Sequence, residues 1–247
     1  MKTSNKLLLF AFVVLLSALA TYNIALKAEY NTKSYQDPYR NYVALNFSGF
    51  EDIEVNSGDM IGVLIEPGDA HAVYLYKGNE EVVQISQQTN TLQIDVATNE
   101  KQNGLRGWGS PQLIIKTPML RILRANALHT LNGEPVTHVK RLKTVEWRNT
   151  TLKGFKQDSI RLELDNGVLV QLDSNELQHL DAVTGTSPGS ESKLLIQNTN
   201  KIQQANLDIR NRSYLSLLNV AIPELRYTLS EQAQVELSGE ALTVLRK

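Results

Sequence analysis

The residues of this chain that could carry out covalent catalysis are concentrated in one segment, Gly185-Thr186-Ser187-Pro188-Gly189. Its spacing matches the G-x-S-x-G motif, in which a strained turn between a strand and a helix exposes a nucleophilic serine. The motif also needs an acid and a histidine later in the chain, but all four histidines precede Ser187. Pro188 and the polar run after it lead into another β-patterned segment. We therefore interpret the segment as a surface turn.

A group of carboxylates is the second chemical possibility. Glu163 and Asp165 end one β-patterned segment, and Asp173 ends the next. If these segments stack, the carboxylates lie about 4.8 Å apart, the spacing of paired strands. Like charges at that distance shift each other's pKa values and can act as an acid and a base. A solenoid lyase or hydrolase acting on polysaccharide would need this arrangement. The ordinary alternative is the solvated face of alternating strands.

The sequence contains no recognisable metal or cofactor motif. The four histidines are scattered: His71, His129, His138 and His179. They form neither an H-E-x-x-H motif nor part of a calcium loop. The segment Gly104-Leu105-Arg106-Gly107-Trp108-Gly109 lacks the order of a phosphate-binding loop. We predict no catalytic residue, no metal site and no cofactor. Trp108 is a candidate contact residue, because aromatic side chains anchor many interfaces; alternatively, it covers the end of the β core.

Positive charge is concentrated in one part of the chain. The formal net charge of −1 argues against a dedicated nucleic-acid-binding protein, yet residues 112–156 hold nine Lys and Arg against two Asp and Glu. Six of these cations form what we call the basic island: Lys140, Arg141, Lys143, Arg148, Lys153 and Lys156. If the chain coils, neighbouring turns bring them together to attract an anionic glycan, a lipid headgroup or a protein. The alternative is a solvated face balanced by acidic residues.

The elements that must position these residues are short β-patterned segments. From residue 45 onward, alternating apolar runs are separated by Asn, Asp, Gly or Ser, and no helix-length amphipathic stretch interrupts them. This pattern excludes a βαβ fold and leaves a β-solenoid or, as the alternative, a β-sandwich. Frequent Asn near the segment ends favours the solenoid, because Asn tolerates a left-handed backbone and can stack in ladders. Residues 118–131 fit either an amphipathic helix or two strands, and the surrounding pattern favours strands.

The N-terminal segment decides where the β domain works. Residues 7–26 lie between Lys6 and Lys27 without a charge, which is long enough for one helix to cross the ~30 Å hydrocarbon core of a bilayer. A signal peptide cleaved near Ala20 is the alternative, but the apolar run continues past that residue. Both interpretations export the rest of the chain. A short N-terminal tail in the cytoplasm is the simpler insertion.

The chain is thus expected to contain an anchor or signal peptide at 1–27, a polar spacer at 28–44 and a β domain at 45–247. Within that domain, we expect a β meander over residues 45–97 and stacked coils over residues 110–247. Because the chain has no cysteine, an exported domain of this size must be held together by its hydrophobic core alone.

One stretch carries a family resemblance: FSGFEDIEVNSGDMIGVLIEPGDAHAVYLYKGNEEVVQISQQTNTLQID. It contains F-x-x-I-x-V from Phe50, V-x-I from Val63 and L-x-I from Leu92. In these spacings it resembles the opening of the auto-transporter adhesin head, or GIN-domain, family of Bacteroidetes envelope proteins. The resemblance covers residues 45–97, and it implies a right-handed β-helix-like exported domain without catalytic residues. Further along, this chain has Asn, Asp and Ser where the family has glycine-rich turns.

These observations predict a non-enzymatic, membrane-anchored, exported β-solenoid protein that serves in binding, adhesion or as an envelope scaffold. The alternative is a solenoid enzyme, a lyase or hydrolase acting on polysaccharide. The expected partners are the membrane, through residues 7–26, and an anionic glycan, lipid headgroup or protein, with no nucleic acid. The predicted location is the cell envelope, with the C-terminal domain outside the cytoplasm. After cleavage, the protein would be periplasmic or secreted.

Overall fold

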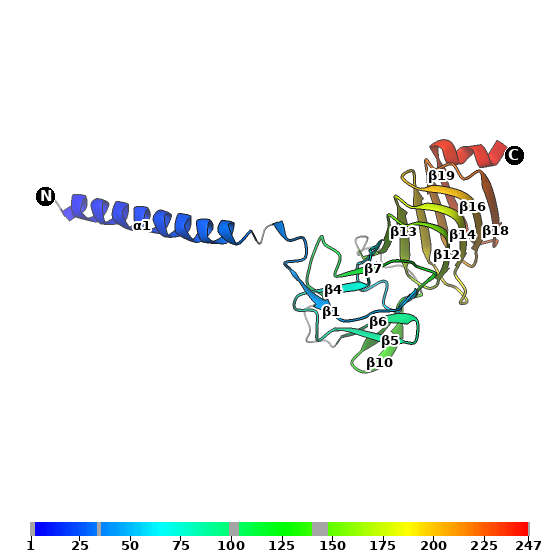
Figure 1. Cartoon of the computed structure of the whole chain (residues 1–247), viewed down its shortest axis with the longest axis horizontal. Coiled ribbons are helices and arrows are strands. Elements are labelled where there is room, and N and C mark those ends of the chain that lie inside the picture. The colour runs from blue at the N-terminus through cyan, green and yellow to red at the C-terminus, as the bar shows by residue number, and fades with distance from the viewer. Residues whose placement is uncertain (1–2, 34–35, 99–103, 140–147, 247) are drawn as a thin grey trace. The chain divides into compact units, whose positions relative to one another are not determined.

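The computed structural model describes residues 3–33, 36–98, 104–139 and 148–246 (Figure 1). The chain divides into two compact units, Met1–Tyr42 and Val43–Lys247.

Helix α1 (Thr3–Thr32) makes up most of the first unit. Within the described residues it is the one helix long and apolar enough to cross a membrane. Its apolar side chains are exposed, as in Leu8 at 71% and Phe10 at 69%. The predicted apolar N-terminal helix is therefore confirmed, and its properties suit either a membrane anchor or a signal sequence.

The second unit consists of two large sheets and a short C-terminal 3-10 helix, η2 (Gly239–Arg246). The nine-stranded sheet has the order β1 (Tyr42–Leu45), β4 (Ala72–Tyr76), β7 (Leu113–Thr117), β3 (Val63–Pro67), β11 (Thr150–Lys153), β13 (Leu169–Asp173), β15 (Lys193–Gln197), β17 (Tyr214–Leu218) and β19 (Gln234–Ser238). The ten-stranded sheet has the order β10 (Glu134–Thr137), β9 (Leu128–Leu131), β6 (Thr91–Thr98), β2 (Asp52–Val55), β8 (Ile122–Ala125), β12 (Lys156–Leu164), β14 (Glu176–Thr184), β16 (Lys201–Ile209) and β18 (Glu224–Leu229), with β5 (Val83–Gln88) paired to β6.

From β11 onward, consecutive strands alternate between the two sheets, and each pairs in parallel with the next strand of its own sheet (Figure 1). Parallel neighbours cannot be joined by a tight hairpin and need a longer crossover connection. Here the connection is a strand of the opposite sheet. Antiparallel pairs occur earlier in the chain, where β4 joins β7, β5 joins β6 and β9 joins β10. The described β unit is mostly strand, as predicted.

The core consists of apolar side chains in register on neighbouring strands. Leu152 of β11 lies beside Leu172 of β13, which lies beside Ile196 of β15 and then Leu217 of β17. All four are almost fully buried, at 0 to 1% exposure. Side chains alternate between the two faces of a strand. The residues immediately before and after each of these four along its own strand therefore point to the opposite face of the sheet. The alternating apolar pattern of the sequence therefore marks a sheet with one buried and one solvated face.

The rows of core residues end at the last two strands. Tyr227, Leu229 and Val235 continue these rows but remain 46%, 40% and 39% exposed. With Leu242 of η2 and the apolar side chains beside them, they line an apolar hollow of about 370 Å³.

Two details of the sequence prediction can be compared with the strands. Residues 118–131 contain two strands, β8 and β9, and no helix, as the surrounding pattern favoured. These strands do not pair with each other, since β8 lies between β2 and β12 and β9 lies between β6 and β10. Some Asn residues near strand ends adopt positive φ, a conformation that Asn tolerates: Asn132, Asn166, Asn211 and Asn219. The division of the β domain into a 45–97 meander and 110–247 coils stays a prediction.

Candidate functional site

A charged hollow of about 380 Å³ lies on the ten-stranded sheet. Glu54 of β2, Arg124 of β8 and Glu163 of β12 occupy one cross-strand row, in which acidic and basic side chains alternate. Their chain neighbours Val55, Ala125 and Leu164 are buried, so this row belongs to the face turned away from the core. The charged hollow is lined by Glu54, Asn56, Arg124, Ala125, Asn126, Arg161, Glu163, Asp165, Val183, Thr186 and Arg210.

Arginines hold Glu163 from two sides. Arg161 Nε donates to Oε1 of Glu163 at 2.8 Å, and Arg124 Nε donates to Oε2 at 3.0 Å. Burial raises the pKa of Glu163, but the hydrogen bonds and charges of Arg161 and Arg124 outweigh burial and lower this pKa below its ordinary value. Glu163 is therefore ionised at neutral pH.

Asp165 follows β12 and is held by hydrogen-bond donors. Its Oδ1 accepts bonds from the backbone N–H groups of Asn166 at 2.9 Å and Ser187 at 3.0 Å, and its Oδ2 accepts the Ser187 hydroxyl. Burial raises the pKa of Asp165, but the bonds from Ser187, Ser190 and Asn166 together lower it below the ordinary value. Glu163 and Asp165 are thus both stabilised as anions.

These contacts bear on two sequence hypotheses, the group of carboxylates and the turn at Ser187. Glu163 and Asp165 share the charged hollow, but Asp173 does not join them, because β13 belongs to the other sheet. Asp173 instead binds the hydroxyls of Ser174 and Thr199, and Lys153 lies 3.4 Å away. The hydroxyl of Ser187 donates a hydrogen bond to Oδ2 of Asp165 rather than to an imidazole. Its segment is a turn with positive φ at both glycines, as the sequence suggested.

The basic island is only partly within the described residues. Lys140, Arg141 and Lys143 lie outside them. Lys153 pairs with Asp173 at 3.4 Å, and Lys156 pairs with Glu176 at 3.2 Å. Arg148 is half-buried, and its Nη1 lies 3.9 Å from Sδ of Met60. Each of these lysines is thus ion-paired with its cross-strand neighbour, Lys153 of β11 with Asp173 of β13 and Lys156 of β12 with Glu176 of β14. Trp108, the other predicted contact residue, is 78% exposed and does not cover the core.

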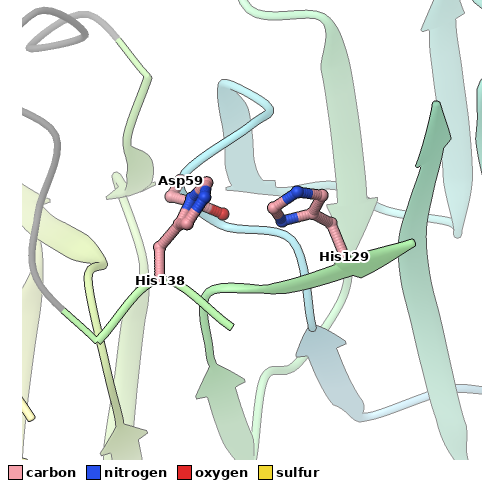
Figure 2. Close-up of side chains that lie close together, drawn as sticks. All are labelled: Asp59, His129 and His138. Carbon is pink, nitrogen blue, oxygen red and sulfur yellow. The ribbon is translucent and has the colours of Figure 1, made fainter. Parts of the chain in front are cut away.

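A second site, absent from the sequence prediction, brings together Asp59, His129 and His138 (Figure 2). Asp59 lies in the turn after β2, and Gly58 N–H in this turn donates to the carbonyl of Asn126 at 2.8 Å. His129 lies on β9, and its antiparallel partner strand β10 leads to His138. The three segments thus converge because this turn, the β8–β9 connection and β10 are joined by backbone hydrogen bonds.

The three side chains point toward one another (Figure 2), and one potential ligand atom from each lies within 4.8 Å of the others. Nδ1 of His138 is hydrogen-bonded to Oδ2 of Asp59, and the two imidazole centroids are 4.7 Å apart. Asp59 and His129 are 5% and 6% exposed, and 30% of the His138 side chain is exposed. Asp59 Oδ1 and His129 Nδ1 are buried without a hydrogen-bond partner among the described residues.

The charges around this cluster act in opposite directions. Burial lowers the pKa of His129, Asp59 raises it and His138 lowers it, and the net result is below the ordinary value. The His129 ring is therefore neutral at pH 7 and carries one nitrogen with a free lone pair. Burial also lowers the pKa of Arg148, while Asp59 raises it. A buried carboxylate and a half-buried guanidinium thus share this region.

Sequence reasoning missed the cluster because its members are 9 to 79 residues apart. Only one signal was present: His129 and His138 flank a possible hairpin, in which residues on paired strands come close. No spacing rule connects either histidine with Asp59.

No family model matches the chain, and a search of curated proteins finds no match. Several solved structures are similar to it. One is named a "putative adhesin" from Bacteroides fragilis, with 11% identity and a TM-score of 0.41, over 80% of this chain and 96% of that one. Another "putative adhesin", from Parabacteroides merdae, has 13% identity and a TM-score of 0.31, over 80% and 95%. A "putative lipid binding protein" from Parabacteroides distasonis has 11% identity and a TM-score of 0.33, over 80% and 94%.

Proposed function

We propose that the chain is a non-enzymatic binding module of the cell envelope, in which a right-handed β-solenoid is held outside the cytoplasm by the N-terminal helix. The alternation of β11 to β19 between two sheets, with parallel pairing within each, supports a winding chain. The exposed apolar surface of α1 supports the tether. The resemblance of residues 45–97 to the GIN-domain family also supports the proposal.

The observation that carries the proposal is the state of the carboxylates in the charged hollow. A glycoside hydrolase needs one carboxyl group with a raised pKa that can donate a proton to the leaving oxygen. Here the pKa values of both Glu163 and Asp165 are lowered, and each carboxylate already accepts hydrogen bonds on both of its oxygens. This arrangement supports recognition over hydrolysis or elimination of a polysaccharide.

The lining of the charged hollow suggests the class of ligand. Three arginines face three acidic residues there, so the two signs balance. Amide and hydroxyl groups of Asn56, Asn126 and Thr186 add further donors and acceptors. Such a mixed surface complements the hydroxyl groups of an uncharged glycan better than it complements a polyanion. Its volume of about 380 Å³ is within the range of small-molecule sites. We therefore propose a neutral envelope or host glycan as the ligand.

The test is retention of the full chain, in detergent, on a glycan array and on extracted envelope polysaccharide. Arg161→Ala and Arg124→Ala should each weaken binding, because they remove donors that line the charged hollow. The matched control is Lys156→Ala. Lys156 lies on β12, as Arg161 does, but its ion pair with Glu176 is outside the hollow. Equal losses in all three variants would contradict the assignment. Release of new reducing ends from the polysaccharide would instead support the enzyme.

Charge reversal at Lys140, Arg141 and Lys143 tests whether the glycan binds in the charged hollow or on the basic island. If the hollow binds the glycan, this triple variant retains binding at all salt concentrations. A salt-sensitive loss, with Arg161→Ala unaffected, would move the binding surface to the basic island.

A further inference from the structure

We propose that Asp59, His129 and His138 form a binding site for a divalent transition-metal cation, with Zn²⁺ as the ion that suits the donor set best. This site is separate from the charged hollow, and the proposal does not depend on the glycan-binding function.

The first support is convergence. Each of the three residues offers a ligand atom within 4.8 Å of the other two, and all three side chains point into one space (Figure 2). An ion that binds there would replace the hydrogen bond between His138 and Asp59. The backbone anchors described above hold the three segments, so side-chain rotations supply the remaining adjustment. Metal sites built on such rigid elements lose little conformational freedom on binding.

The second support is independent of the spacing. Oδ1 of Asp59 and Nδ1 of His129 are buried, and neither has a hydrogen-bond partner among the described residues. Leaving such an atom unsatisfied destabilises the fold, and unsatisfied groups in a native protein call for an explanation such as a bound ion or water. Here two of them belong to two members of the same three-residue cluster. A cation that accepts both lone pairs removes both costs.

The chemistry of the donors selects the ion. Two imidazole nitrogens and one carboxylate oxygen suit Zn²⁺ and its neighbours in the transition series, whereas Ca²⁺ and Mg²⁺ prefer oxygen ligands alone. Three protein ligands leave a tetrahedral zinc ion one further position, which water can occupy. The partly exposed ring of His138 gives the ion a route to solvent.

Arg148 is the feature that opposes this assignment. Its positive charge acts on Asp59, so it partly neutralises the anionic ligand and repels a cation. The same electrostatic interaction suggests a competing interpretation, in which Arg148 rather than an ion balances the charge of Asp59. The two interpretations predict opposite results for Arg148→Gln. This variant binds Zn²⁺ severalfold more tightly if the cluster holds the ion.

The experiment is isothermal titration of the full chain with ZnCl₂, after purification in detergent without a histidine tag and removal of metal with a chelator. We expect saturation at one Zn²⁺ per chain, a rise in Tm with Zn²⁺ that chelation reverses, and the visible absorption of tetrahedral Co²⁺ when cobalt replaces zinc. Asp59→Asn, His129→Gln and His138→Gln should each weaken binding by about tenfold or more, since even supporting residues of metal sites contribute 10- to 100-fold.

His179→Gln is the matched control, because His179 lies exposed on β14 away from the cluster. It should bind Zn²⁺ as the parent chain does. If the buried variants unfold, circular dichroism will reveal it, and His138→Gln, at the partly exposed position, then decides. The proposal is overturned by the absence of saturable binding near one ion per chain, by equal loss in His179→Gln, or by weaker binding in Arg148→Gln.

Discussion

Asn175 and Asn200 occupy equivalent positions immediately before the paired strands β14 and β16, and the side-chain amide of Asn175 donates to Oδ1 of Asn200 at 2.9 Å. The backbone N–H of Asn175 donates to the same oxygen at 3.1 Å. Asn175 also accepts the backbone N–H of Phe155 and donates to the carbonyl of Leu152, each at 3.0 Å. With both residues buried, this is a short asparagine ladder that satisfies backbone groups inside the β unit.

Asn175→Ala should destabilise the protein by about 3–5 kcal/mol, because it leaves the buried N–H of Phe155 without its acceptor and removes a donor from the Leu152 carbonyl and from Oδ1 of Asn200. Urea denaturation of the full chain in detergent, followed by tryptophan fluorescence, measures the free energy of unfolding. Asn206→Ala is the control: its amide donates to Asp181 on the exposed face, so its effect should stay within about 0.5 kcal/mol. Similar losses in both variants would mean that the ladder contributes no special stability.

Gly185→Ala and Gly189→Ala should differ although both glycines have positive φ, at 71° and 76°. A Cβ at Gly185 would meet Ser213 Oγ and would lie 2.5 Å from the carbonyl oxygen of Arg210, whereas at Gly189 the nearest atom is 3.8 Å away. Strain alone costs about 1–2 kcal/mol, and overpacking against backbone adds about 1–3 kcal/mol at Gly185. The Tm of Gly185→Ala should therefore be well below the Tm of Gly189→Ala. Equal Tm values would show that the turn relaxes freely.

Ser187→Ala should reduce the loss of stability in acid. Because the folded-state pKa of Asp165 is lowered, ionised Asp165 stabilises the fold above its unfolded pKa of about 3.9, and this stabilisation disappears as the pH falls through the lowered folded value. Removing the Ser187 hydroxyl raises the folded-state pKa of Asp165 toward its unfolded-state pKa. The free energy of unfolding at pH 7 and at pH 3 should then differ less than in the parent chain. In an Asp165→Asn background the serine substitution should leave this difference unchanged, and any remaining pH effect there would assign it to another group.

Membrane fractionation tests the role of α1. If the helix is a permanent anchor, the protein will stay in the membrane pellet after an alkaline wash, and its intact mass will include residues 1–20. Ala20→Leu, which blocks cleavage after an A-x-A site, should then change neither result. A mature chain that starts near residue 21, with a precursor accumulating in Ala20→Leu, would identify a signal peptide instead.

Much of the architecture could be predicted from local patterns. The uncharged run from Leu7 to Leu26 predicts a lipid-compatible helix, because helix length and bilayer thickness are matched. Alternation of apolar and polar residues, as from Ile160 to Leu164, predicts strands with one solvated face, because successive side chains of a strand point to opposite sides. The positive φ of Asn166 and Asn211 follows from the tolerance of Asn for the left-handed conformation. These properties depend on a residue and its close neighbours alone.

Tertiary structure alone decided which distant residues meet. Asp165 and Asp173 follow similar sequence patterns, yet they belong to strands of different sheets, so only Asp165 joins Glu163 in the charged hollow. His129 and His138 reach Asp59 because backbone hydrogen bonds join the turn after β2 to the β8–β9 connection. Contacts of this kind are set by strand order and register. The alternating pattern within one strand does not specify either, because it suits that strand equally well next to any neighbour. The sequence by itself therefore determined the kind of surface, while packing determined which charges and ligands share it.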